Sequence, residues 1–340
     1  MTDYYSTYDL KHVINASGKM TILGVSKVPE AAIQAQQFGD THFFEMKDLV
    51  DKTGAYIAKK LGTEGAVVVN SASAGIAEAV AGIIGEGSKY HVYHPFSSRY
   101  AKREIILPKG QNVDYGTPEE VMIELGGGRV VEAGYANMCT PEHVEMMITA
   151  NTAAIFYVKS HHAVQKSMLT IQEALEVAHR HELPLILDAA AEEDLHKYVE
   201  MGVDVVLFSG AKAIEGPASG LVFGKEPYIG WTKLQGLGIG RAMKIGKENL
   251  LGFTTALSQY LDHGPESGEA MKKRLHPFVA ALNEVPHLNV KEVQDGAGRP
   301  IFRAAVTVEA ASPKNAKQVT AELKAGDPAI YTLSLIHISE

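Results

Sequence analysis

The sequence predicts an α/β protein with a large domain on a mostly parallel sheet and a small α+β domain near the C-terminus. Short apolar runs rich in β-branched residues alternate with amphipathic stretches along most of the chain, which is the pattern of a parallel sheet with crossover helices. A chain of 340 residues exceeds one ordinary core but suits a large domain with a smaller partner. Three predicted strands end in loops of small, acidic or basic residues, at the place where open α/β sheets bind ligands.

The first half of the chain gives clear local signals. Apolar residues at helical spacing in 48–61 predict a helix, and the β-branched run 65–71 predicts a strand. Thr140 followed by Pro141 is a good start for another helix, because threonine caps helices and proline is favoured at their first position. The expected elements are helix 48–61, strand 65–71, helix 76–84, strands 103–108 and 129–134, helix 141–150, strand 153–160 and helix 170–182.

The second half continues the alternation. A strand at 184–192 contains an acid, and a strand at 203–212 ends in a lysine. The run 220–225 is expected to be an antiparallel return strand. The later elements are expected to be a long helix, an alternating strand and a further helix, at 241–261, 299–309 and 313–324.

These elements predict an N-terminal segment 1–45, a large domain 46–255 and a small C-terminal domain 256–332. The final residues 333–340, LSLIHISE, resemble the translation of a sequencing adapter and are excluded from the fold prediction. The small domain is accordingly expected to be truncated.

Composition narrows the classes of function. A net charge of −8 argues against a nucleic-acid partner, because neutralising phosphates requires a basic surface. No apolar run has the length of a membrane span, and the polar N-terminus lacks the core of a signal peptide. Cys139 is the single cysteine, which fits a reducing compartment. We expect a cytoplasmic protein without a membrane partner.

The first candidate loop follows strand 65–71. It contains Ser71, Ala72, Ser73, Ala74 and Gly75. Small side chains let backbone N–H groups approach a phosphate, and a helix N-terminus adds positive potential. Taken alone, this loop is better explained as a plain tight turn.

The second loop carries Asp188, which follows a run of buried apolar residues. Burying this carboxylate costs free energy unless a cation or a helix N-terminus holds it. The third loop carries Ser209 and Lys212 after the next strand. A lysine here is explained either by a side chain extending to solvent or by a reactive amine.

The order of the three loops favours one cofactor. A phosphate loop, an acid and a lysine on adjacent strand ends fit pyridoxal 5′-phosphate, with Asp188 holding the protonated ring nitrogen and Lys212 forming a Schiff base. Small residues such as Ala190 leave room for the flat ring, and Ser209 is placed to bind the phosphate.

Longer segments resemble a known family. The selenocysteine synthase group of fold-type-I pyridoxal-phosphate enzymes is similar to this chain at INASGKMTILG (14–24), GPASG (216–220) and RAMKIGKENLLG (241–252). Within that group, ANMCTPE (136–142) and DAAAEEDL (188–195) resemble the D-glucosaminate-6-phosphate ammonia-lyase family. The resemblance covers about residues 10–325. It implies an aspartate-aminotransferase-like fold and a homodimer or larger homo-oligomer.

The resemblance also implies roles for individual residues. Lys159-Ser160-His161 matches a K-x-H motif of the group, which places His161 near the phenolic oxygen of the cofactor as a catalytic candidate. Ser71, Ala72, Ser73, Gly75, Ala190 and Ser209 are expected to contact the cofactor together with Asp188 and Lys212. The candidates for binding the substrate's phosphate and carboxylate are Lys19, Arg241, Lys244, Lys247 and Arg303.

The expected reaction is an α,β-elimination that releases ammonia from a phosphorylated amino sugar acid, with Lys212 as the base. Three alternatives remain open at this point. One is a selenium transferase acting on a charged tRNA, which the acidic charge disfavours. Another is a different pyridoxal-phosphate lyase or aldolase. The third is a non-catalytic binding subunit, which the intact Asp188 and Lys212 disfavour.

Overall fold

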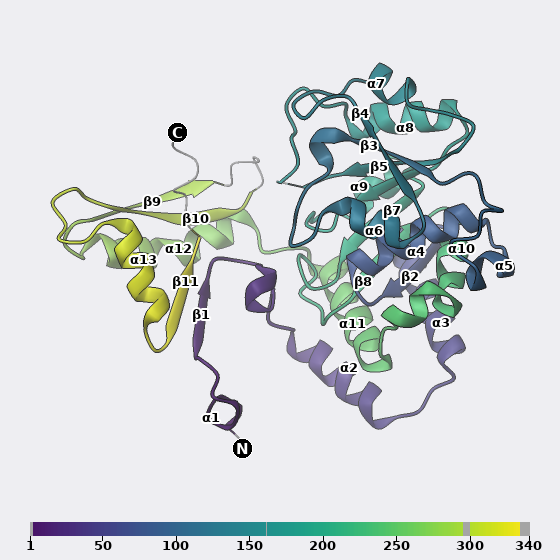
Figure 1. Ribbon diagram of the computed structural model, residues 1–340. Helices are drawn as coiled ribbons and strands as arrows, with labels where there is room; N and C mark the ends of the chain where they lie inside the picture. Colours follow the sequence, from purple (N-terminus) through teal and green to yellow (C-terminus); the bar gives the residue numbers. More distant parts are fainter. Residues whose placement is uncertain (1–2, 161, 295–299, 334–340) are drawn as a thin grey trace. The chain divides into compact units, whose positions relative to one another are not determined.

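The computed structural model describes residues 3–160, 162–294 and 300–333, and within it the chain forms two compact units (Figure 1). The large unit is Lys27–Gly264, and the small unit joins Met1–Ser26 to Pro265–Glu340. These boundaries differ from the predicted ones after residues 45 and 255. The N-terminal residues belong with the C-terminal ones because strand β1 (Val13–Ala16) pairs with strand β11 (Ala329–Thr332), a contact between remote segments.

The large unit contains a seven-stranded sheet in the order β2-β8-β7-β6-β5-β3-β4. Strand β8 runs antiparallel to its neighbours β2 and β7, and the other neighbouring strands are parallel. The predicted fold class, including the antiparallel return, is confirmed. The strands are β2 (Gly65–Val69), β3 (Glu104–Pro108), β4 (Arg129–Ala133), β5 (Thr152–Val158), β6 (Leu185–Asp188), β7 (Val205–Ser209) and β8 (Gly220–Gly224).

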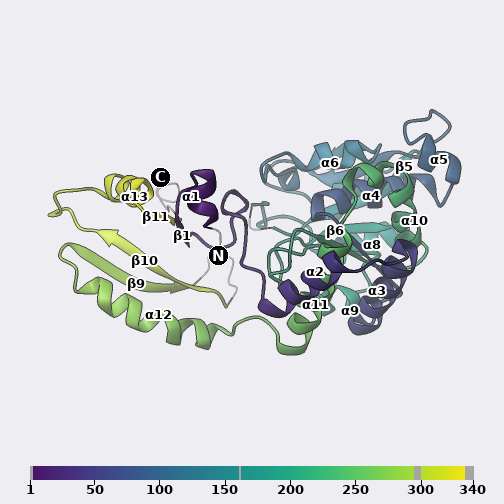
Figure 2. The same cartoon turned by 90° about the horizontal axis from the view of Figure 1, so that it is seen from below.

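Helices cover both faces of this sheet (Figure 2). On β5, Ile155 and Tyr157 belong to one hydrophobic cluster, whereas Phe156 and Val158 belong to the other. Because alternate residues of a strand point to opposite faces, a continuous apolar run is what a sheet buried on both sides requires. One face is covered by α4 (Ala72–Gly85), α6 (Glu119–Leu125) and α10 (Tyr228–Leu234), and the other by α3 (Met46–Leu61), α8 (Ile171–Arg180), α9 (His196–Glu200) and α11 (Lys247–His263).

Helix α2 (Glu30–Thr41) packs along α11 and was not predicted. The two helices approach closely, since a Cβ on Gly39 would lie 2.7 Å from the Cα of Glu248. Lys247 donates from its Nζ to the carbonyl oxygens of Gly39 and Asp40, which suits a cation at a helix C-terminus. Lys247, a candidate for binding the substrate, therefore binds the carbonyl groups at the C-terminal end of α2 instead.

The remaining elements of the large unit are short. They include helices on the loops that connect the longer elements, and a 3₁₀ turn at the start of the region predicted as one long helix. They are α5 (Lys89–Tyr93), η2 (Lys109–Gln111), α7 (Pro141–Glu145), η3 (Gln235–Leu237) and η4 (Ile239–Met243).

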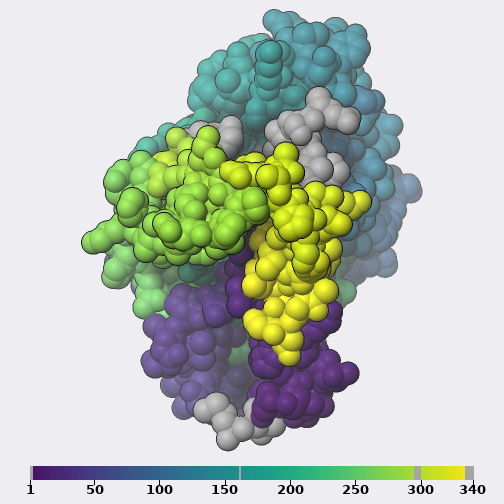
Figure 3. All heavy atoms as spheres, turned by 90° about the vertical axis from the view of Figure 1, so that its left-hand side faces the viewer, coloured from purple at the N-terminus to yellow at the C-terminus, as the bar shows by residue number. Residues whose placement is uncertain are grey.

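The small unit is built from two two-stranded sheets and two longer helices. Besides the β1–β11 pair, β9 (Leu288–Gln294) and β10 (Phe302–Val308) form an antiparallel ribbon. Helix α12 (Gly268–Asn283) packs on this ribbon, and α13 (Ala316–Ala325) packs on β11. In Figure 3 the C-terminal part of this unit faces the viewer in yellow-green and yellow. The unit also contains α1 (Tyr4–Tyr8) and η1 (Thr21–Leu23). Of the tail expected at 333–340, residues 334–340 lie outside the described residues.

Candidate active site

The three predicted loops meet at one edge of the large sheet. The edge comprises the carboxyl ends of the parallel strands and the start of β8. In register, Gly220 of β8 lies between Val69 of β2 and Ser209 of β7, and Asp188 of β6 pairs with Leu207 of β7. The loop after β2, the acid and the lysine loop are therefore neighbours, as the sequence predicted.

Ser71 and Ser73 belong to the start of helix α4. The Ser71 hydroxyl accepts from the backbone N–H of Ala74 at 3.0 Å and so caps the helix, which begins at Ala72. The sequence predicted a loop as far as Gly75, but the helix starts earlier because a serine cap followed by small residues needs no loop. The first turn thus presents backbone N–H groups and the Ser73 hydroxyl at a positive helix end, which suits a phosphate.

Gly75 faces the sheet rather than the edge. A Cβ on Gly75 would lie 2.9 Å from side-chain carbons of Leu207 and Val222. The missing side chain therefore lets α4 pack closely against β7 and β8. Gly75 therefore has a packing role, because it lets the start of α4 lie close to the sheet.

Asp188 is the last residue of β6 and is only 8% exposed. Its Oδ1 accepts from the backbone N–H of Ala190 at 2.9 Å. Its backbone carbonyl accepts from the N–H of Lys159, at the end of the neighbouring β5, at 2.8 Å. These bonds fix a carboxylate at the edge of the sheet with one oxygen left for a further partner.

The lysine loop is held in place by backbone hydrogen bonds. The N–H of Ser209 donates to the carbonyl of Ala190 at 3.3 Å, which joins this loop to the acid loop. The N–H of Gly210 donates to Ser219 at 2.9 Å. Lys212 is half-buried in this loop, and among residues 3–160, 162–294 and 300–333 no group forms a hydrogen bond or ion pair with its Nζ. The amine is therefore positioned for a ligand.

Two further side chains join this group, and the sequence prediction missed both. The Tyr115 hydroxyl lies 3.1 Å from the Ser73 hydroxyl, and burial raises the pKa of Tyr115 to about 12. Glu119 is buried, and desolvation, followed by the charge of Asp188, raises its pKa well above the usual range of a carboxyl group. A signal was present: both residues follow strand β3, whose carboxyl end lies at the same edge of the sheet as β6.

The predicted substrate residues belong to different parts of the chain. Arg241 lies in η4 and Lys244 follows it in extended conformation, so they do not share a helix face as predicted. Both are exposed. Lys19 and Arg303 belong to the small unit. His161 lies outside the described residues.

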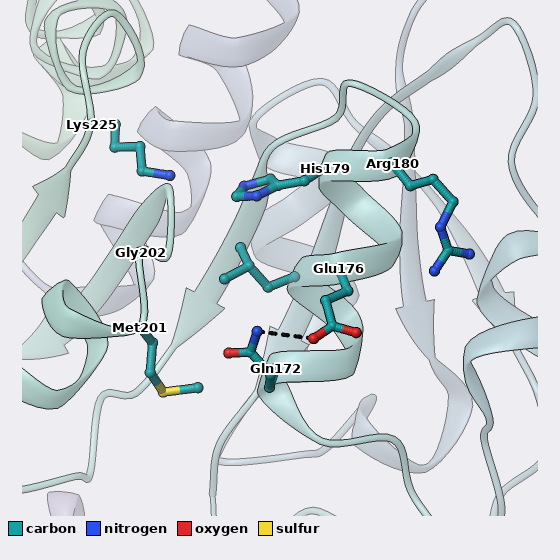
Figure 4. A pocket seen from close by; sticks show the side chains of 8 residues that line it. Gln172, Glu176, His179, Arg180, Met201, Gly202 and Lys225 are labelled. Atoms are coloured by element: carbon teal, nitrogen blue, oxygen red, sulfur yellow. Dashed lines mark hydrogen bonds between the residues drawn. The ribbon is translucent and has the colours of Figure 1, made fainter.

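A hollow of about 550 Å³ in the large unit lies at the opposite ends of the strands (Figure 4). Beneath it Asp204, just before β7, accepts from His179 Nε2, Lys225 Nζ and the Leu185 N–H, each at 2.9 Å. These bonds use the carboxylate fully and tie together β6, β7 and β8. The hollow is therefore separate from the site of Asp188 and Lys212.

Two further findings concern the part of the chain that the structure covers. No three histidine, cysteine or acidic side chains there are arranged to hold a metal ion. No helix there has both the length and the apolar character needed to cross a membrane.

A glycine controls the spacing between the helix start and the lysine loop. A Cβ on Gly220 would lie 2.4 Å from the carbonyl carbon of Ser71 and 2.5 Å from the N of Ala72. We expect Gly220→Ala to lower the free energy of unfolding by about 1–3 kcal/mol, because backbone atoms must move. Thermal denaturation measures this loss. Gly236→Ala is the matched control, since no atom lies within 4 Å of its added Cβ; equal stability of both variants would contradict the close approach.

The site residues are consistent with a flat, phosphorylated cofactor. The first turn of α4 and the hydroxyls of Ser73 and Ser209 suit a phosphate, the Asp188 carboxylate suits a protonated ring nitrogen, and Lys212 offers an amine to an aldehyde. Each donor lies on the same edge of one sheet.

Comparison with known proteins places this chain in a family. The family model of L-seryl-tRNA selenium transferase matches residues 53–285. D-glucosaminate-6-phosphate ammonia lyase of Salmonella typhimurium is 45% identical over 96% of this chain and 88% of its own length. A Streptomyces 5'-C-glycyluridine monooxygenase-decarboxylase is 35% identical over 94% of this chain and 81% of its own.

A solved structure agrees with these matches. The structure of D-glucosaminate-6-phosphate ammonia-lyase superimposes with a TM-score of 0.92 at 44% identity, over 98% of this chain and 90% of that one. The resemblance inferred from the sequence is confirmed. The chain belongs to the selenium transferase family and, within it, to the group that contains D-glucosaminate-6-phosphate ammonia lyase.

Proposed function

We propose that this protein is a pyridoxal-phosphate-dependent carbon–nitrogen lyase that converts D-glucosaminate 6-phosphate to a 2-keto-3-deoxy acid phosphate and ammonia. The observation that carries the proposal is the grouping of Asp188, Lys212 and the start of α4 at one edge of the sheet. The near full-length similarity to an ammonia lyase supports the substrate.

Each group has a defined part in binding the cofactor. The N–H groups of the first turn of α4, with the hydroxyls of Ser73 and Ser209, hold the phosphate. Asp188 holds the ring nitrogen in its protonated form, since a carboxylate stabilises an adjacent cation. When bound, the cofactor supplies an electron sink that stabilises negative charge on the carbon bearing the substrate amine.

The proton transfers belong to Lys212. Its Nζ, once free of the cofactor, accepts the proton from the carbon that bears the amine. The hydroxyl on the neighbouring carbon then leaves with a proton as water. One water molecule is later consumed when the nitrogen is released as ammonia, so the overall reaction needs no oxidant or other co-reactant.

The remaining parts of the proposal concern the residues that bind the substrate, the cellular location and the oligomeric state. Lys19, Arg241, Lys244 and Arg303 remain candidates for binding the substrate's anionic groups, and His161 for the cofactor's phenolic oxygen. We propose that the protein is cytoplasmic. We also propose a homo-oligomer, because fold-type-I sites form between subunits and because the large unit exposes aromatic side chains, of which Phe43 is completely exposed. A single-chain mass in sedimentation would contradict the oligomer.

The test is a product assay on the protein reconstituted with pyridoxal phosphate. With D-glucosaminate 6-phosphate we expect ammonia and a 2-keto acid in equal amounts, without consumption of oxygen. Oxygen uptake with release of carbon dioxide would instead favour chemistry of the kind named for the Streptomyces relative. Cofactor binding without any product would contradict the proposed substrate.

A further inference from the structure

Glu119 is a buried carboxyl group that the proposed reaction does not use. It is the first residue of α6 and is 1% exposed. Among the residues described, no N–H or O–H group donates to either of its carboxyl oxygens. An ionised carboxylate without donors is strongly unfavourable in such a place, so the group is expected to be neutral there.

Among the residues that the structure describes, the ionisable groups Asp188, Lys212 and Tyr115 interact electrostatically with Glu119. Asp188 raises the pKa of Glu119 through its negative charge and through a side-chain hydrogen bond. Two carboxyl groups can share a hydrogen bond only if one of them carries a proton, because an ionised carboxylate is purely an acceptor.

The surroundings decide which of the two carries the proton. Asp188 accepts a backbone N–H from Ala190, which stabilises its ionised form, whereas Glu119 has no such donor. Burial and then the negative charge of Asp188 raise the pKa of Glu119 well above its usual range, against the opposing effect of Lys212. The proton therefore lies on Glu119 at neutral pH.

We propose that Glu119 is a neutral carboxylic acid that donates a hydrogen bond to Asp188 and is thereby a positioning residue for the cofactor's ring nitrogen. The proposal rests on the proposed function, since it assumes that Asp188 holds that nitrogen. The donated hydrogen bond fixes the orientation of Asp188 and keeps its negative charge, which the protonated ring requires. An ionised Glu119 would instead push a proton onto Asp188.

Infrared spectroscopy tests the protonation state without cofactor or substrate. Wild-type protein at neutral pH should show carbonyl absorption from protonated carboxylic acids, to which buried Glu78 also contributes because burial raises its pKa to about 8. We expect Glu119→Gln to lose the part of this absorption that belongs to Glu119. Glu124→Gln, on the exposed side of the same helix, is the matched control and should keep the band. Identical spectra of wild type and Glu119→Gln in this region would overturn the proposal.

Cofactor binding tests the positioning role. Glutamine keeps a neutral donor, so Glu119→Gln should bind pyridoxal phosphate within about threefold of wild type, whereas Glu119→Leu, which lacks a donor, should bind about tenfold to a hundredfold more weakly. The visible absorbance band of the bound cofactor should titrate at the wild-type pH in Glu119→Gln and be shifted in Glu119→Leu.

The outcomes separate this inference from the proposed function. Equal loss of affinity in Glu119→Gln and Glu119→Leu would show that the ionised form matters and would refute the neutral donor. Wild-type affinity in Glu119→Leu would refute the positioning role. Wild-type protein that binds no pyridoxal phosphate would refute the proposed function, while the infrared result would still decide the protonation of Glu119.

Discussion

Replacing Lys212 by alanine is expected to abolish turnover of D-glucosaminate 6-phosphate, with a fall in kcat on the order of 10⁴-fold or more. The reason is that one amine serves both to attach the cofactor and to remove the substrate proton. Ammonia release under saturating substrate measures the loss, and the absorbance spectrum should lack the yellow colour of the lysine-bound cofactor.

The matched control for this variant is Lys59→Ala, because Lys59 is an exposed lysine of α3. It should keep both colour and activity. Full activity in Lys212→Ala would contradict the mechanism, because a group other than Lys212 would then have to act as the base.

Replacing Asp188 by asparagine is expected to lower kcat/KM by about a hundredfold or more, because the amide cannot stabilise a protonated ring nitrogen. The side chain keeps its size, and its oxygen can still accept from the Ala190 N–H, so the fold should be unaffected. Steady-state kinetics measures the loss.

The absorbance spectrum distinguishes the two variants. Asp188→Asn retains Lys212, so we expect it to stay yellow while its activity falls, whereas Lys212→Ala should be colourless. Wild-type kcat/KM in Asp188→Asn would show that the carboxylate does not hold the ring nitrogen.

Those parts of the site that lie directly after a buried strand could be predicted from the sequence. Asp188 and Lys212 each follow a run of apolar residues, and adjacent parallel strands end at the same edge. Local pattern and topology point to the same place in these two cases.

The parts that depend on contacts between remote segments could not be predicted in this way. Glu119 lies at the start of a helix that follows β3. Its interaction with Asp188 depends on the sheet order, in which only β5 lies between β3 and β6. The N-terminal strand joins the small unit through its pairing with β11. The helix predicted at 241–261 begins at Lys247, because the preceding glycine-rich stretch forms short 3₁₀ turns instead.

The central claim is that Lys212 binds the cofactor covalently beside Asp188. Borohydride reduces a carbon–nitrogen double bond between a lysine and pyridoxal phosphate to a stable link, and trypsin does not cleave after a modified lysine. After reduction and digestion, mass spectrometry should therefore find one modified peptide, spanning residues 198–225 and carrying the added mass on Lys212. Modification of another lysine, with Lys212 left unmodified and cleaved, would contradict the account.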